Sequence, residues 1–198
     1  GLKSQYRKYW DNTTLDANIF TGTVETYKKN RELVGAIDAQ LSSQIGNQWD
    51  IDARLRRASQ DTFMRRYKFG YDTSLKSTFS ATRVIGNRYY VVKASDRQSM
   101  LSSDKDINEQ TILPYVFYEK TSKGWRHNQL FRRENSLLQL DNDEGYDFAR
   151  WNGTFTVSEE IKMPLGITSY EGAISANHYS LHDKPVGAAS SLGDYSFA

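Results

Sequence analysis

Cysteine is absent from the 198 residues of the chain. Its absence excludes disulfide frameworks, cysteine-ligated zinc, iron–sulfur clusters and thiol nucleophiles, and it is compatible with an oxidising compartment. Long apolar runs are also absent, since no stretch approaches the roughly 20 residues that a membrane-spanning helix requires. A strong charge of either sign is lacking too, because 26 basic and 24 acidic residues leave a net charge of +2. The composition therefore gives no electrostatic signature of nucleic-acid or membrane binding.

The start of the chain lacks an initiating Met, and no signal-type apolar segment follows Gly1. We therefore expect a processed product or an excised piece whose upstream flank supplied a signal or an anchor. What the chain does contain is aromatic surface: Phe, Trp and Tyr make up 13% of the residues. Their large side chains compensate for a small aliphatic content and favour a folded domain.

The first third of the sequence has spacings typical of helices. Its apolar residues recur mostly three or four positions apart; they are Leu15, Ile19, Tyr27, Val34, Ile37, Leu41 and Ile45. This pattern predicts a helix over 14–46, preceded by a short helix over 2–10. A second apolar stripe predicts a helix over 50–68, folded back antiparallel on the first.

From residue 72 the apolar period changes from about four to two, which predicts strands. Gly86-Asn87 marks a hairpin turn, 95–109 reads as a polar surface loop, and further turns are expected at 121–124 and 141–145. The fold class predicted is α+β, with an N-terminal helical hairpin packed on an antiparallel sheet of about six strands. We expect one domain over 1–198, with a helical part over 1–70, the sheet over 71–183 and a flexible or docking tail over 184–198.

Two patterns have features of metal sites but fit them poorly. His178, His182 and Asp183 have the spacing of helical ligands, yet on a strand the two rings lie about 13 Å apart, too far to share an ion. The turn 141–145 begins like a calcium loop but lacks the closing bidentate Glu. No metal and no cofactor is expected.

The predicted second helix concentrates basic side chains. Arg54, Arg57, Arg65 and Lys68 would form a stripe able to meet phosphates or an anionic headgroup. A solvated helix face has the same composition, and nucleic acid is an improbable partner.

Four aromatic residues around the predicted hairpins are candidates for contact with a ligand or a partner: Trp125, Trp151, Tyr118 and Tyr146. The alternative is that they fill the core. No nucleophile elbow, phosphate loop or dinucleotide fingerprint occurs. A pocket assembled from distant residues such as Tyr90, His127 and Asp147 would need no motif, so an enzyme stays open although we lean against one.

These observations favour a non-catalytic, extracytoplasmic domain, sensor- or adaptor-like, that binds a protein partner or a small ligand. Its membrane attachment would come only through the missing N-terminal flank, and a homo-oligomer is compatible with the sequence. Two alternatives remain: a structural subunit of a larger assembly, such as a virion or secretion machinery, and a small enzyme with a cone-fold pocket. We expect a periplasmic, secreted or virion-exposed location.

Overall fold

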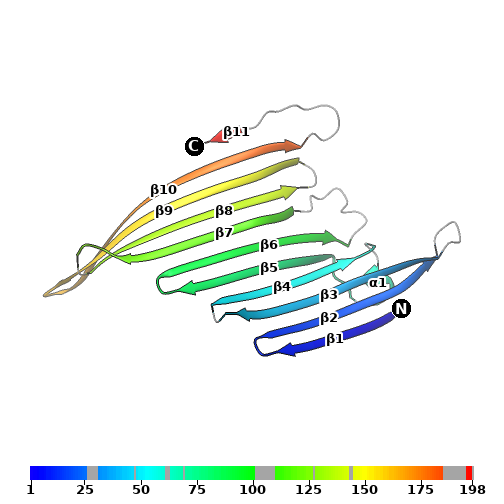
Figure 1. The fold of residues 1–198 in the computed structure, drawn as a ribbon. Coiled ribbons are helices and arrows are strands. Elements are labelled where there is room, and N and C mark those ends of the chain that lie inside the picture. Colours follow the sequence, from blue (N-terminus) through cyan, green and yellow to red (C-terminus); the bar gives the residue numbers. More distant parts are fainter. Residues whose placement is uncertain are drawn as a thin grey trace. The chain divides into compact units, whose positions relative to one another are not determined.

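The computed structural model describes residues 1–25, 31–46, 48–60, 63–68, 70–100, 110–126, 128–142, 145–184 and 195–197. These residues fold almost entirely as antiparallel strands (Figure 1). The elements are β1 (Leu2–Trp10), β2 (Thr13–Glu25), β3 (Arg31–Ile45), β4 (Trp49–Ala58), α1 (Phe63–Arg66), β5 (Ser74–Ile85), β6 (Arg88–Ser99), β7 (Gln110–Lys123), β8 (Gln129–Asn142), β9 (Gly145–Met163), β10 (Gly166–Lys184) and β11 (Tyr195–Phe197).

The strands hydrogen-bond in the order in which they occur in the sequence, from β1 to β11. The chain divides into two compact units. The first comprises Gly1–Ala81 and Lys93–Thr111, and the second comprises Thr82–Val92 and Ile112–Ala198. Within the described part of the chain, no helix has the length and apolarity needed to cross a membrane.

The predicted helical hairpin is wrong. Within 14–46 the described residues form β2 and β3, and residues 2–10 form β1. Within 50–68 the described residues form most of β4 and the one-turn helix α1. The physical reason is visible in β3, where Gly35, Ala39 and Ser43 fill the positions between the large apolar residues. A spacing of four is also two strand periods, so Ile37, Leu41 and Ile45 share one face of a strand.

The prediction of strands in the second half is confirmed, but the predicted sheet of about six strands is wrong for the whole chain, because the sheet formed by the described residues has 11 strands and includes the first third. The hairpin turn at Gly86-Asn87 joins β5 to β6, and Gly86 has the positive φ of 56° that this turn requires. Residues 95–99, predicted as loop, continue β6. In the predicted tail, Tyr195–Phe197 form β11 on β10, and the other residues after 184 lie outside the described part.

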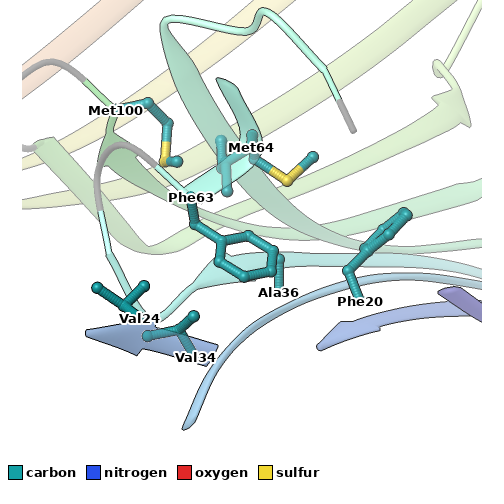
Figure 2. Packing of buried hydrophobic residues seen from close by; sticks show 8 residues of the cluster. Phe20, Val24, Val34, Ala36, Phe63, Met64 and Met100 are labelled. Atoms are coloured by element: carbon teal, nitrogen blue, oxygen red, sulfur yellow. The ribbon is translucent and has the colours of Figure 1, made fainter. Parts of the chain in front are cut away.

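The buried core of the first unit lies under α1 (Figure 2). Phe63 is 0% exposed, and its ring packs with side chains from β2 and β3. The cluster comprises Phe20, Val24, Val34, Ala36, Phe63, Met64, Leu75 and Met100. Tyr67 closes its edge: the ring lies 4.9 Å from Phe63, and the hydroxyl donates to the Thr23 carbonyl at 2.5 Å. One helical turn thus suffices to bury the apolar end of β2 and β3.

Candidate functional site

In the first unit, strand pairing separates apolar from polar side chains by face. Leu15 pairs with Leu41 and Ile19 with Ile37, while Ala39 pairs with Leu55 on the next strand. Because directly paired residues point to the same side of a sheet, these side chains share one face. We call this the first apolar face: Trp10, Leu15, Ala17, Ile19, Leu33, Ile37, Ala39, Leu41, Ile45, Trp49, Ile51, Ala53 and Leu55.

The second unit shows the same division. Leu137 pairs with Trp151, and Phe155 pairs with Ile174. The second apolar face consists of Phe131, Leu137, Ala149, Trp151, Phe155, Val157, Ile161, Met163, Tyr170, Ile174 and Ala176. The opposite face of β9 between Asn152 and Lys162 carries only polar side chains. In both units one face is therefore mainly apolar and the other mainly polar. Lys8 and Arg57 also lie on the first apolar face, and Arg133, Asn135, Glu159 and His178 also lie on the second.

Large side chains on both apolar faces are exposed. Leu33 on the first is 78% exposed and Ile174 on the second is 77% exposed. Contiguous apolar patches of this kind on a protein mark contact with a partner or a membrane. The apolar faces are therefore the main candidate functional surfaces.

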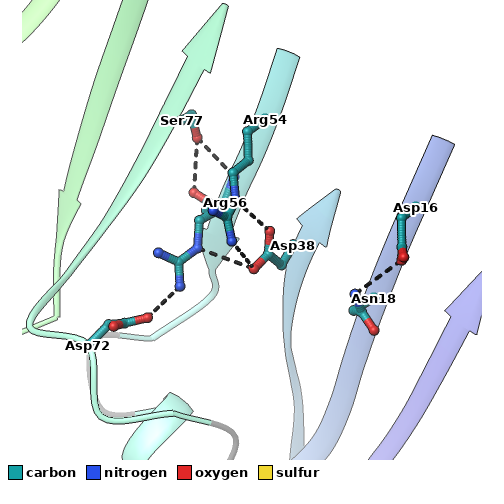
Figure 3. Close-up of polar contacts among 7 residues, drawn as sticks. All are labelled: Asp16, Asn18, Asp38, Arg54, Arg56, Asp72 and Ser77. Carbon is teal, nitrogen blue, oxygen red and sulfur yellow. Dashed lines mark hydrogen bonds and ion pairs between the residues drawn. The ribbon is translucent and has the colours of Figure 1, made fainter. Parts of the chain in front are cut away.

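The polar face of the first unit is crossed by ion pairs and hydrogen bonds between neighbouring strands (Figure 3). Arg7 contacts Asp16 at 2.7 Å, and Ser42 donates a hydrogen bond to Asp52 at 2.7 Å. Asp38 accepts from Arg54 at 3.0 Å. These pairs form a ladder of polar contacts that joins β1 to β2 and β3 to β4.

Asp38 is the centre of this ladder. It lies between Arg54 and Arg56, and Arg56 also pairs with Asp72. Arg54 donates two hydrogen bonds to Asp38, from Nε at 3.1 Å and from Nη2 at 3.0 Å.

The polar face of the second unit has uncharged pairs at its centre. Asn152 donates to Asn177 at 2.7 Å, and the Thr154 and Ser175 hydroxyls lie 3.1 Å apart. Arg132 and Glu134, two positions apart on β8, are 3.4 Å from each other. This face therefore offers hydroxyl, amide and paired charged groups to water.

The four predicted aromatic residues lie in different settings. Trp125 is 94% exposed in the turn between β7 and β8, and its ring contacts Phe131, which contacts Phe155 in turn. Trp151 belongs to the second apolar face. Tyr118 is half-buried with its ring 5.1 Å from Tyr90, and Tyr146 lies exposed at the start of β9 on the opposite face from Trp151. Their role in contacting a ligand or partner stays a prediction.

The predicted basic stripe does not lie along one helix. Arg54 and Arg57 are on opposite faces of β4, and Arg57 pairs with Asp96. Arg65 is in α1 and Lys68 follows it, and both are exposed. A role for these four residues in binding phosphates also stays a prediction.

The assembled pocket suggested by the sequence is not brought together. Tyr90 lies on β6 and Asp147 on β9, with two strands between them, and His127 is outside the described residues. His178 and His182 share one face of β10, four positions apart. Of the turn 141–145, residues 143 and 144 are outside the description.

Sequence reasoning missed the apolar faces themselves. The signal was present as alternation along the strands, in which small residues such as Ala17, Ala39 and Gly153 occupy positions between larger apolar ones. Counting only large apolar residues hides this period of two.

Comparison with known proteins gives one family assignment. Curated protein sequences gave no significant match to the chain. The family model described as "LptD: LPS transport system D" matches residues 33–195. This match covers most of the chain, so the protein belongs to the LptD family, and the extracytoplasmic, partner- or ligand-binding role expected from the sequence is confirmed at that level.

Proposed function

We propose that this chain is part of an outer-membrane component that transports lipopolysaccharide, and that its two apolar faces lie against lipid hydrocarbon. The observation that supports this most directly is the division of side chains by face in both units. Alternation of apolar outward and polar inward residues along antiparallel strands is typical of strands embedded in the outer membrane.

The length of the apolar stretches supports the proposal. On β3 the apolar face runs from Leu33 to Ile45 without a charged side chain. At about 3.3 Å per residue and a tilt of about 45°, such a stretch spans roughly 28 Å of bilayer thickness. This is close to the roughly 30 Å of a hydrocarbon core.

Energetics favours the same arrangement. Each exposed apolar side chain transferred from water to hydrocarbon contributes about 25 cal/mol per Å². The first apolar face ends in Trp10 and Trp49, beside the short turns after β1 and before β4. Tryptophan prefers the boundary between hydrocarbon and water, so these positions suit an interface. Lys8 extends over the Trp10 ring at 4.7 Å, which brings its charge to the same boundary.

The polar faces would then meet water, a polar cargo or a protein partner. Their hydroxyl, amide and paired ionic groups can exchange hydrogen bonds with a passing or docked molecule without leaving a buried charge unpaired. The family assignment does not single out the sensor or adaptor role inferred from composition, and transport explains the two-faced sheet better.

The experiment that tests this proposal uses the lack of native cysteine. Single cysteines replace Ala173, Ile174, Ser175 and Ala176 on β10, all of which are exposed in the chain by itself. In lipid vesicles, a water-soluble maleimide should label positions 173 and 175 and spare 174 and 176. In urea all four should react alike, which is the control. Uniform labelling in vesicles would refute the lipid contact.

A further inference from the structure

A groove of about 470 Å³ is cut into the second apolar face. Its floor is Gly153 paired with Ala176, and Trp151, Phe155 and Ile174 form its apolar walls. The Trp151 ring leans over the glycine, because a Cβ at Gly153 would lie 2.8 Å from the ring. The groove therefore depends on two small residues facing each other across β9 and β10.

A basic side chain stands at the rim of this groove. Arg133 pairs directly with Phe155, and Asn135 pairs directly with Gly153. Neither Arg133 nor Asn135 makes a hydrogen bond or an ion pair with the residues that the structure describes. The nearby Glu134 points to the other face, where it contacts Arg132.

Arg133 is a charged side chain on a mainly apolar part of the sheet. Its neighbours on the apolar face of β8, β9 and β10 are Phe131, Trp151, Phe155 and Ile174. An ionisable side chain among lipid-facing residues is costly unless a partner of opposite charge meets it. No protein group among the described residues supplies that charge, so the partner has to come from the surrounding medium.

We propose that the groove is a binding site for one anionic phospholipid of the membrane, with an acyl chain along Trp151, Phe155 and Ile174 and the headgroup phosphate on Arg133. This inference rests on the proposed function, since it requires the apolar face to lie in lipid. The planar guanidinium donates two parallel hydrogen bonds to a phosphate, and the Asn135 amide is placed to donate another.

Charge complementarity selects the class of lipid. A headgroup with a net negative charge neutralises Arg133, whereas a zwitterionic headgroup brings its own cation next to the guanidinium. We therefore expect phosphatidylglycerol to occupy the groove in preference to phosphatidylcholine.

Fluorescence of Trp151 reports directly on the groove. The full chain is reconstituted in vesicles that contain phosphatidylglycerol and phosphatidylcholine in one fixed ratio, with bromine on the acyl chains of either one lipid or the other. Quenching of Trp151 is taken as the difference between the unmodified chain and the Trp151→Phe variant. Bromine on phosphatidylglycerol should quench about fivefold more effectively per mole than bromine on phosphatidylcholine.

Two adjacent arginines provide a matched comparison. Arg133→Gln should abolish the preference for phosphatidylglycerol, while Arg132→Gln, on the opposite face, should keep it. On the unmodified chain, quenching should saturate at a low mole fraction of brominated phosphatidylglycerol and rise gradually with brominated phosphatidylcholine. This titration needs no variant, so it tests the site even when Arg133→Gln fails to fold.

The outcomes separate this inference from the proposal on which it rests. Equal quenching by both brominated lipids, or a preference that survives in Arg133→Gln, overturns the binding site and leaves the lipid contact of the apolar face intact. No quenching by either lipid overturns both.

Discussion

Apolar side chains gather in two kinds of place in this molecule, and the contrast between them is informative. Under α1, Phe63 and Leu75 are almost completely buried by other parts of the chain. On the two apolar faces, residues of the same types, such as Leu33 and Ile174, are largely exposed. The first group has its packing partners within the protein. The second group needs its partners from outside.

The two groups also lie on different sides of the same strands. Phe20 and Val24 point to the polar face, where α1 covers them, while Ile19 points to the apolar face. A single sheet of this kind forms a buried core only where a connecting segment folds back over one of its faces. The difference teaches that the helical turn is local packing on the polar face, and that the apolar faces are left open along their length.

The largest effect is expected in the core. Phe63→Ala should lower the free energy of unfolding by about 3–5 kcal/mol, because it removes buried surface and leaves a cavity under α1. Phe155→Ala on the second apolar face should cost less in vesicles, since fluid lipid fills the space and only the transfer contribution is lost. Urea unfolding of both variants in vesicles measures the difference. An equal loss in the free energy of unfolding for Phe63→Ala and Phe155→Ala would contradict the distinction between core and apolar face.

A charge on the first apolar face should have the next largest effect. Leu41→Arg should destabilise the chain in vesicles by about 2–4 kcal/mol, the cost of a guanidinium in hydrocarbon. Its neighbour Gln40 is exposed on the polar face, so Gln40→Arg should stay within about 0.5 kcal/mol of the parent chain. The same urea titration compares them, and an equal cost for the two variants would argue against lipid on the apolar side.

A close approach of two elements gives the third prediction. A Cβ at Gly22 would lie 2.7 Å from the Tyr67 ring, whereas nothing lies within 4 Å of one at Gly172. Gly22→Val should displace Tyr67 from the core and cost about 1–3 kcal/mol through overpacking. Gly172→Val should be neutral or slightly stabilising, because valine favours strands. Melting temperatures of the two variants test this, and a stable Gly22→Val chain would show that Tyr67 does not fix α1.

The smallest effect is expected from the ion pairs on the polar face. Arg54 and Asp38 are both partly exposed, so a double-mutant cycle with Arg54→Gln and Asp38→Asn should give a coupling of about 1 kcal/mol or less. The coupling should fall further in 1 M salt, where exposed charges are screened. A coupling above 2 kcal/mol that resists salt would mean that the ladder is shielded from water.

The sequence predicted the second half of the fold better than the first, for a physical reason. Gly86-Asn87 is a strong turn signal between two runs of strand-forming residues, and the hairpin there is confirmed. In 14–46 the small residues between the large apolar ones made the alternation look like a helical spacing. Gly22 and Gly35 argue against a helix, and both are needed in the sheet for close contacts.

The candidate site was only partly predictable. Trp151 was singled out as an exposed aromatic residue, and it forms a wall of the groove on the second apolar face. Arg133 and Gly153 were not singled out, because the register between β8, β9 and β10 is what brings them to the same groove. This register joins Arg133 to Phe155, 22 positions away, and Gly153 to Ala176, 23 positions away, and no local pattern encodes it.

The strand order has a consequence for how the chain acquires its structure. Every strand pair of known register joins consecutive strands, as in β2 with β3 and β9 with β10. Each new strand therefore closes only a short loop onto the one just formed, which keeps the entropic cost of each step small. The sheet can assemble one hairpin at a time in the direction of synthesis, with each completed strand acting as the template for the next.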